Sequence, residues 1–78
     1  MTNWEERVVL NPEILAGKPV VKGTRLSVEF ILELLGNGVS MEEILEKYPR
    51  ITKEDVLACV AYASEILHDI RVFPLKAS

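Results

Sequence analysis

Three helix-start signals follow one another between residues 26 and 56. Ser27, Ser40 and Thr52 each follow an apolar residue, and each has another apolar residue four positions later. A Ser or Thr in this setting caps a helix by accepting a hydrogen bond from a backbone N–H, while the apolar pair packs across the cap. Glu43 and Asp55 stand three residues after the second and third caps, the spacing of a capping box. The sequence therefore predicts a mainly α-helical chain with three helices.

The predicted helices cover residues 28–36, 41–48 and 53–70. Glycines at 36 and 38 end the first helix and Pro49 ends the second, because both residue types interrupt helices. A three-residue turn, residues 49–51, separates the second helix from the third cap, a length typical of helix-turn-helix proteins. The predicted fold class is a three-helix, homeodomain-like or winged-helix-like bundle.

A short β-hairpin arm is predicted before the helices. Residues 7–10 and Val20-Val21 are rich in β-branched residues, which favour strands. Between them, Asn11-Pro12 resembles a helix start and predicts one helical turn over residues 13–16, which Gly17 ends. The lead-in before residue 7 is expected to be loose, with Trp4 packing on the body of the fold or on a partner. The single domain, residues 1–78, thus divides into an arm at 7–26, a bundle at 27–70 and an apolar tail at 71–78.

Size and composition exclude several classes of protein. A chain of 78 residues makes one domain, and so short a chain buries only about 60% of its unfolded surface. Cys59 is the single cysteine and His68 the single histidine, so no disulfide and no metal cluster is expected. With 49% of the residues apolar, oligomerisation is the expected source of further stability. The sequence has no signal peptide and no run of about 20 apolar residues, so a cytoplasmic protein without membrane contact is expected.

The most basic stretch of the chain is its arm. Residues 14–28 hold three basic residues and no acid, whereas residues 29–69 hold nine acids and three Lys or Arg. The net charge of −3 argues against nucleic-acid binding by the whole surface. The third helix begins with Glu54 and Asp55 among its first residues, where a recognition helix needs Arg, Lys, Asn or Gln. Contacts with operator DNA are therefore predicted at the arm and the turn, namely at Lys18, Lys22, Thr24, Arg25 and Arg50. The alternatives are that these cations are merely solvated, and that Arg25 pairs with Glu29.

The helices carry more apolar surface than one small core can cover. The first helix has apolar residues on two faces, and residues 56–64 of the third helix include no charge. Such helices are typical of contacts with another subunit or a partner protein. A homodimer through the first and third helices is expected. The predicted oligomer or partner interface comprises Phe30, Leu34, Cys59, Tyr62, Ile66, Phe73 and Leu75.

The sequence contains no recognisable set of catalytic residues. Cys59 lies in an apolar run, which favours a packed thiol over a nucleophile. His68 and Asp69 are adjacent, and adjacent residues on a helix do not face each other. The Gly-rich stretch lacks the Gly-Lys-Ser/Thr of a phosphate-binding loop. No enzyme activity, cofactor, metal or small-molecule substrate is therefore expected.

The sequence also resembles a small prokaryotic family. The motif residues are Asn11-Pro12-Glu13-Ile14-Leu15 and, from Gly17 to Arg25, Gly-Lys-Pro-Val-Val-Lys-Gly-Thr-Arg. This pattern is similar to the family named domain of unknown function 433, a group of predicted antitoxins. The resemblance implies a helix-turn-helix-like domain, often dimeric, that is encoded beside a PIN-like ribonuclease toxin and neutralises it. The alternatives are a stand-alone DNA-binding regulator and a structural dimer module.

Overall fold

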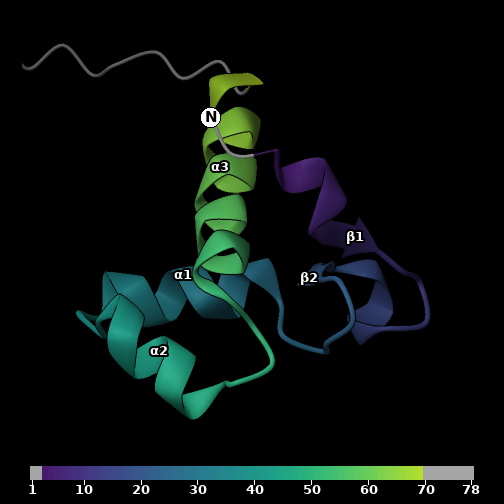
Figure 1. The fold of residues 1–78 in the computed structure, drawn as a ribbon. Helices are drawn as coiled ribbons and strands as arrows, with labels where there is room; N and C mark the ends of the chain where they lie inside the picture. Colours follow the sequence, from purple (N-terminus) through teal and green to yellow (C-terminus); the bar gives the residue numbers. More distant parts are fainter. Residues whose placement is uncertain (1–2, 70–78) are drawn as a thin grey trace, which may run out of the picture.

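Three α-helices follow a two-stranded ribbon in the computed structural model, which describes residues 3–69 (Figure 1). The helices are α1 at Val28–Gly36, α2 at Met41–Lys47 and α3 at Lys53–Asp69, and the strands are β1 at Val8–Leu10 and β2 at Pro19–Val21. α1 and α2 lie at the N-terminal end of α3, and the ribbon lies on the opposite side of α3 from α2. The predicted fold class, mainly α with a short N-terminal β-arm, is confirmed.

All three predicted helix caps form. The Ser27 hydroxyl accepts a hydrogen bond of 2.9 Å from the N–H of Phe30. Ser40 forms a reciprocal capping box with Glu43. Thr52 forms the third cap, because its hydroxyl accepts from the N–H of Asp55 at 3.2 Å and its own N–H donates to the Asp55 carboxylate at 2.9 Å. Each cap contributes about 1 kcal/mol to stability, and together they set the predicted starts of the helices.

The ribbon is part of the hydrophobic core. β1 and β2 pair antiparallel, with Val8 opposite Val21 and Val9 opposite Val20. Two strands of this length are not stable alone in water. Val8, Val20 and Val21 are buried, and the ribbon packs against α1 and α3. The core cluster consists of Val8, Val21, Val28, Ile31, Ile44, Ile51, Val56, Ala58 and Cys59.

The connection between the strands differs from the predicted helical turn. The Asn11 side chain accepts a hydrogen bond from the N–H of Glu13, as a capping residue would. However, the 3-10 turn Leu15–Gly17 has φ of 49° at Leu15 and 56° at Ala16, in the left-handed region. Gly17 continues this conformation with φ of 83°. The predicted right-handed turn is wrong because the chain must reverse here to bring β2 back beside β1.

Residues 3–6 form a capped turn, so the expected loose lead-in is wrong for these residues. A 3-10 turn at Trp4–Glu6 is capped by the Asn3 side chain. The Trp4 ring makes an edge-to-face contact with Tyr62, with ring centroids 4.8 Å apart. The Trp4 indole N–H also donates to Glu65 at 2.9 Å. The expectation that Trp4 packs on the body of the fold is confirmed.

The core thiol generates a prediction about alkaline stability. Burial, with a smaller contribution from the nearby Asp55 carboxylate, raises the pKa of Cys59 from 9.0 to about 11. The folded protein therefore retains this proton between pH 9 and about 11 while the unfolded chain loses it. This group stabilises the fold fully below pH 9, and its contribution falls as the pH rises toward 11. Urea unfolding across this range should show a steeper loss of stability in the native protein than in Cys59→Ala. Equal slopes would contradict the burial of the thiol.

Candidate binding surfaces

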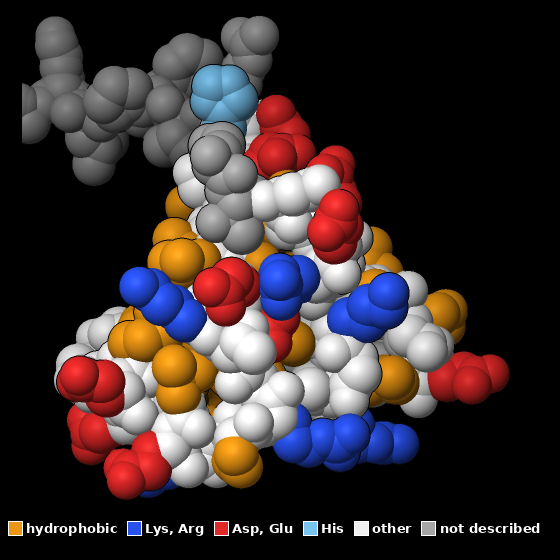
Figure 2. Space-filling model, viewed as in Figure 1, with side chains coloured by type: hydrophobic (Ala, Val, Ile, Leu, Met, Phe, Trp, Pro, Cys, Tyr) orange, Lys and Arg blue, Asp and Glu red, His pale blue; other side chains and the backbone are white. Residues whose placement is uncertain are grey.

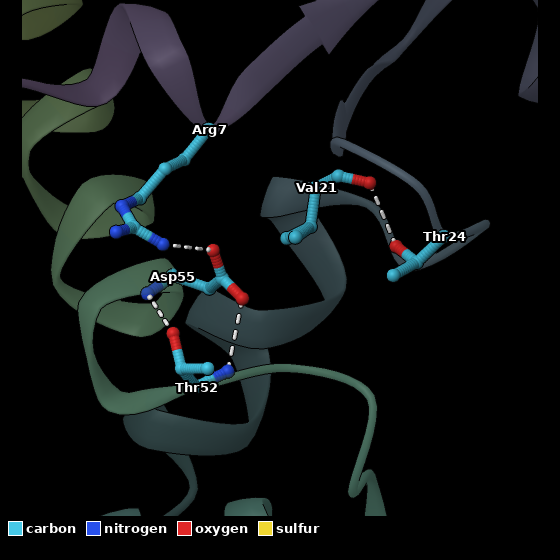
Figure 3. A network of polar contacts seen from close by, with 5 residues as sticks. All are labelled: Arg7, Val21, Thr24, Thr52 and Asp55. Carbon is cyan, nitrogen blue, oxygen red and sulfur yellow. Dashed lines mark hydrogen bonds and ion pairs between the residues drawn. The ribbon is translucent and has the colours of Figure 1, made fainter.

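Asp55 joins the start of α3 to the arm (Figure 3). One carboxylate oxygen accepts from Arg7 Nη1 at 3.1 Å, and the other accepts from the Thr52 N–H. The Asp55 side chain is 12% exposed and that of Arg7 is 39% exposed. The sequence suggested that Asp55 would disfavour DNA binding by the third helix. In the structure this carboxylate is largely buried and paired with Arg7. Glu54, its neighbour, is the exposed acid in this turn.

An apolar groove of about 590 Å³ lies between α1 and the C-terminal half of α3. Leu32 of α1 and Tyr62 of α3 line it, together with two strongly exposed residues, Ile66 and Leu67. Ile66 is 42% exposed and Leu67 is 64% exposed. Large apolar side chains that gather in one hollow mark a site for another apolar group more often than scattered ones do. The remaining lining residues are Lys18, Pro19, Val28, Glu29, Glu33 and Ala63.

An exposed ion pair lies at the rim of this groove. Lys18 Nζ donates to Glu29 Oε1 at 3.2 Å, and both side chains are more than half exposed. Such a pair contributes at most about 1 kcal/mol. The predicted alternative, an Arg25–Glu29 pair, is not formed; Glu29 pairs instead with Lys18, the residue before β2. Arg25 instead lies beyond the ribbon, at a second groove.

The second groove is basic and has a volume of about 310 Å³. Arg25, Lys47 and Arg50 line it around Tyr48, with Thr24, Leu26 and Pro49 completing the wall. These three cations are exposed, and no ion pair involves them among residues 3–69. Over the face shown in Figure 2, by contrast, Lys and Arg side chains form separate groups, with acidic and uncharged surface between them. The basic groove is therefore a local feature of a surface without a general positive field.

The residues predicted to contact DNA are divided between these surfaces. Thr24, Arg25 and Arg50 meet at the basic groove, whereas Lys18 lies at the apolar one. Lys22 is exposed and lines neither groove. Thr24 also has a structural role, because its hydroxyl donates to the Val21 carbonyl at 2.8 Å and accepts from the Leu26 N–H at 3.0 Å (Figure 3).

Lys47 is a basic-groove residue that sequence reasoning missed. A usable signal was present, since Lys47 lies in the last turn of α2 and only two residues before Pro49. Because α2 ends at Lys47, this side chain lies beside the α2–α3 turn that carries Arg50. The three cations of the groove thus come from the turn between β2 and α1, the end of α2 and the α2–α3 turn.

The residues predicted at an interface have different environments. Tyr62 and Ile66 line the apolar groove. Phe30 is half-buried against Tyr48 in an edge-to-face contact, with centroids 5.7 Å apart, and Leu34 packs partly buried on the core. Cys59 is fully buried in the monomer, so its side chain presents no surface to a partner. Phe73 and Leu75 lie outside the described residues. Leu32 and Leu67 are groove residues absent from the predicted interface.

A family model described as "Protein of unknown function (DUF433)" matches residues 8–63, most of the chain. The chain belongs to this family. The family resemblance inferred from the arm motif is thereby confirmed. The match includes the ribbon and the basic groove, and it ends at Ala63, before Ile66 and Leu67.

One curated relative is similar in sequence, and one solved structure is similar in fold. The uncharacterized protein y4eO of Sinorhizobium fredii (strain NBRC 101917 / NGR234) is 38% identical over 58 residues, which cover 74% of this chain and 26% of that protein. The chain thus spans about a quarter of the length of this relative. A crystal structure of a DUF433 member protein from Anabaena variabilis ATCC 29413 matches with a TM-score of 0.75 at 24% identity, covering 80% of this chain and 61% of that one. This likeness supports the fold.

Within residues 3–69, no group of three or more His, Cys, Asp and Glu residues is placed to hold a metal ion. None of the helices in this range is both long and apolar enough to cross a membrane. The two grooves are the candidate binding surfaces considered for the described residues.

The two ion pairs of the arm generate a matched stability prediction. Arg7→Met leaves the largely buried Asp55 carboxylate without its cation, and it should lower the free energy of unfolding by about 1 to 2 kcal/mol. Lys18→Met removes an exposed ion pair and should change the free energy of unfolding by less than about 0.5 kcal/mol. Urea denaturation of both variants measures the difference. Equal effects would show that Asp55 does not depend on Arg7.

Proposed function

We propose that this chain is a non-catalytic, antitoxin-like binding protein that masks a PIN-like ribonuclease through the groove between α1 and α3. The exposure of Ile66 and Leu67 beside Leu32 and Tyr62 is the observation that carries the proposal. A groove of this kind fits an apolar helix face or an extended apolar segment of a partner. The nuclease identity comes from the family resemblance.

The charges around the groove favour a basic partner. Glu29 and Glu33 lie on its rim, and Lys18, the cation among its described lining residues, already pairs with Glu29. A ribonuclease presents positive charge where it holds RNA, so an acidic rim complements it and speeds its association. Inhibition by occupancy requires only a stable complex. No residue of this chain needs to perform chemistry in that role.

DNA binding is the second candidate function, and the basic groove favours it. Arg25, Lys47 and Arg50 converge at the turn that joins α2 to α3, the part of a helix-turn-helix that lies near the DNA backbone. Phosphate contacts of this kind position a protein without reading sequence. This function is compatible with the first, because the basic and apolar grooves share no lining residue.

The homodimer expected from the sequence stays a prediction. It would use the same exposed faces of α1 and α3 as the proposed partner. Sedimentation of the purified chain over a range of concentrations distinguishes the two uses of this surface. If a stable dimer persists in the complex with the partner, the partner must bind a face other than the groove.

A matched pair of α3 variants tests partner binding. Ile66 and Leu57 are exposed to similar extents, 42% and 39%, but only Ile66 lines the groove. Ile66→Asp should weaken capture of a PIN-like ribonuclease at least about tenfold, the effect of losing roughly 1.4 kcal/mol of binding, whereas Leu57→Asp should capture it normally. The readout is co-purification in high salt, followed by recovery of ribonuclease activity when the tagged chain is removed. Capture by Ile66→Asp at the native level would refute the groove as the interface.

A second set of variants tests the DNA interface. Replacing Arg25, Lys47 and Arg50 together by Ala removes three phosphate contacts, so the slope of log affinity against log salt should decrease in magnitude by about 2.7. Lys18→Ala should leave both the affinity and the slope unchanged, because Lys18 lies at the other groove. Gel retardation of promoter DNA at several salt concentrations supplies the measurement. Unchanged retardation by the triple variant would exclude the basic groove.

A further inference from the structure

The basic groove combines cations with apolar surface. Its cations come from three separate segments of the chain, and they are Arg25, Lys47 and Arg50. Its apolar wall consists of Leu26, Tyr48 and Pro49. Leu26 and Tyr48 pack partly buried on the core, so the fold holds this wall in place, whereas Pro49 and the three cations are exposed. A ligand that fills the groove therefore needs an anionic group and an apolar part close together.

No carboxylate opposes the cations among the described lining residues. That lining includes no Asp or Glu, and no ion pair involves Arg25, Lys47 or Arg50 within residues 3–69. A sphere of about 310 Å³ is about 8 Å across, close to the Debye length of about 8 Å at physiological salt. Positive charges around so small a space act together on one anion, which also offsets their mutual repulsion. The groove is thus suited to a phosphate group, which accepts hydrogen bonds from several cationic side chains at once.

Tyr48 gives the groove an aromatic surface that neighbouring residues hold in place. Its ring meets Phe30 edge to face, with centroids 5.7 Å apart and ring planes at 88°. Its backbone N–H donates to the Ile44 carbonyl at 2.9 Å as α2 ends, and the next residue, Pro49, has a fixed φ. Aromatic side chains in basic grooves serve as stacking surfaces for unpaired bases. The guanidinium planes of the groove's two arginines offer further stacking surface.

The size of the groove selects a single nucleotide over a duplex. Its volume of about 310 Å³ lies at the lower end of the range of about 300 to 1,000 Å³ that is typical of small-ligand sites. The backbone of a duplex presents phosphate and sugar while its bases are stacked inside, so it would leave Tyr48 without a contact. An unpaired nucleotide instead presents a phosphate and a free aromatic base together.

We propose that the basic groove binds one unpaired nucleotide, with its phosphate among Arg25, Lys47 and Arg50 and its base against Tyr48. The ligand chemistry is that of a nucleoside monophosphate, which either a free nucleotide or one residue of a single strand supplies. The inference rests on the proposed assignment of nucleic-acid contacts to this groove, but the ligand needs neither a promoter duplex nor a protein partner. Single strands and duplex DNA would compete for the same cations.

Titration of the isotope-labelled full chain with adenosine monophosphate tests the proposal. The chemical shifts of the Tyr48 ring and of the Arg25 and Arg50 side chains should change together and saturate. Ribose phosphate, which lacks the base, should bind at least about fivefold more weakly, because it cannot stack on an aromatic side chain. Equal affinities for the two compounds, or shift changes that leave Tyr48 unaffected, would overturn the proposal.

A short single-stranded oligodeoxyadenylate distinguishes the two sources of the nucleotide. Tighter binding of the strand than of adenosine monophosphate would support the proposal with a strand residue as the ligand. Equal or weaker binding of the strand would support it with the free nucleotide as the ligand. If neither compound binds, the proposal is wrong.

Variants of Tyr48 separate base stacking from a structural role. Tyr48→Leu keeps an apolar side chain but removes the aromatic face, so it should weaken adenosine monophosphate binding at least about fivefold and leave ribose phosphate binding unchanged. Tyr48→Phe should bind both compounds as the native chain does. The ratio of the two affinities is the readout, because a loss of stability would lower both together. A native ratio in Tyr48→Leu would refute the stacking role.

A matched pair of cation variants tests the phosphate contacts. Arg25→Gln should weaken both compounds, whereas Lys22→Gln, which changes an exposed cation of the same arm outside both grooves, should weaken neither. Equal effects of the two variants would contradict the proposed site. Gel retardation of promoter duplex separates this inference from the proposed function. Normal retardation by a chain that does not prefer adenosine monophosphate over ribose phosphate would refute the nucleotide site alone, and the opposite result would refute the duplex interface alone.

Discussion

The paired carboxylate of Asp55 is the interaction on which the arrangement of this domain depends. It completes the cap of α3 through Thr52 and reaches Arg7, the residue immediately before β1. A ribbon of two short strands has no independent stability, so its position is set by what it touches. The ion pair fixes the start of the ribbon on α3, and the burial of Val8 and Val21 then completes the core. The ion pair and the buried valines thus act together to orient the arm on the helical bundle.

Both binding surfaces combine the arm with the helices. Lys18, just before β2, and Pro19, its first residue, form one end of the apolar groove, while Thr24 and Arg25 from the following turn form a wall of the basic groove. A short stretch of chain therefore contributes to two sites of opposite character. Under the proposed function, adjacent surfaces of one small domain would hold a protein partner and a phosphate backbone, and the motif-bearing arm would contribute to both.

The features that the sequence predicted well are those whose causes are local. Helix caps at Ser27, Ser40 and Thr52 depend on residues within one turn, so their pattern is readable directly. The pairing of Asp55 with Arg7 joins residues 48 positions apart and has no local signal. The expected Arg25–Glu29 pair assumed that residues four apart lie on one helix face. Arg25 lies before α1 begins at Val28, so that rule does not apply to it. Similarly, α3 is apolar on more than one face, so only packing decides that Cys59 turns inward while Ile66 and Leu67 remain exposed.

Tyr62 lies between the N-terminal segment and the apolar groove. One side of its ring meets Trp4, and the residue also lines the groove. Trp4 is the single tryptophan of the chain, so all indole fluorescence comes from this contact. Anything that enters or leaves the groove and moves the Tyr62 ring changes the surroundings of that indole. The domain consequently carries an intrinsic optical reporter of groove occupancy, available without any label.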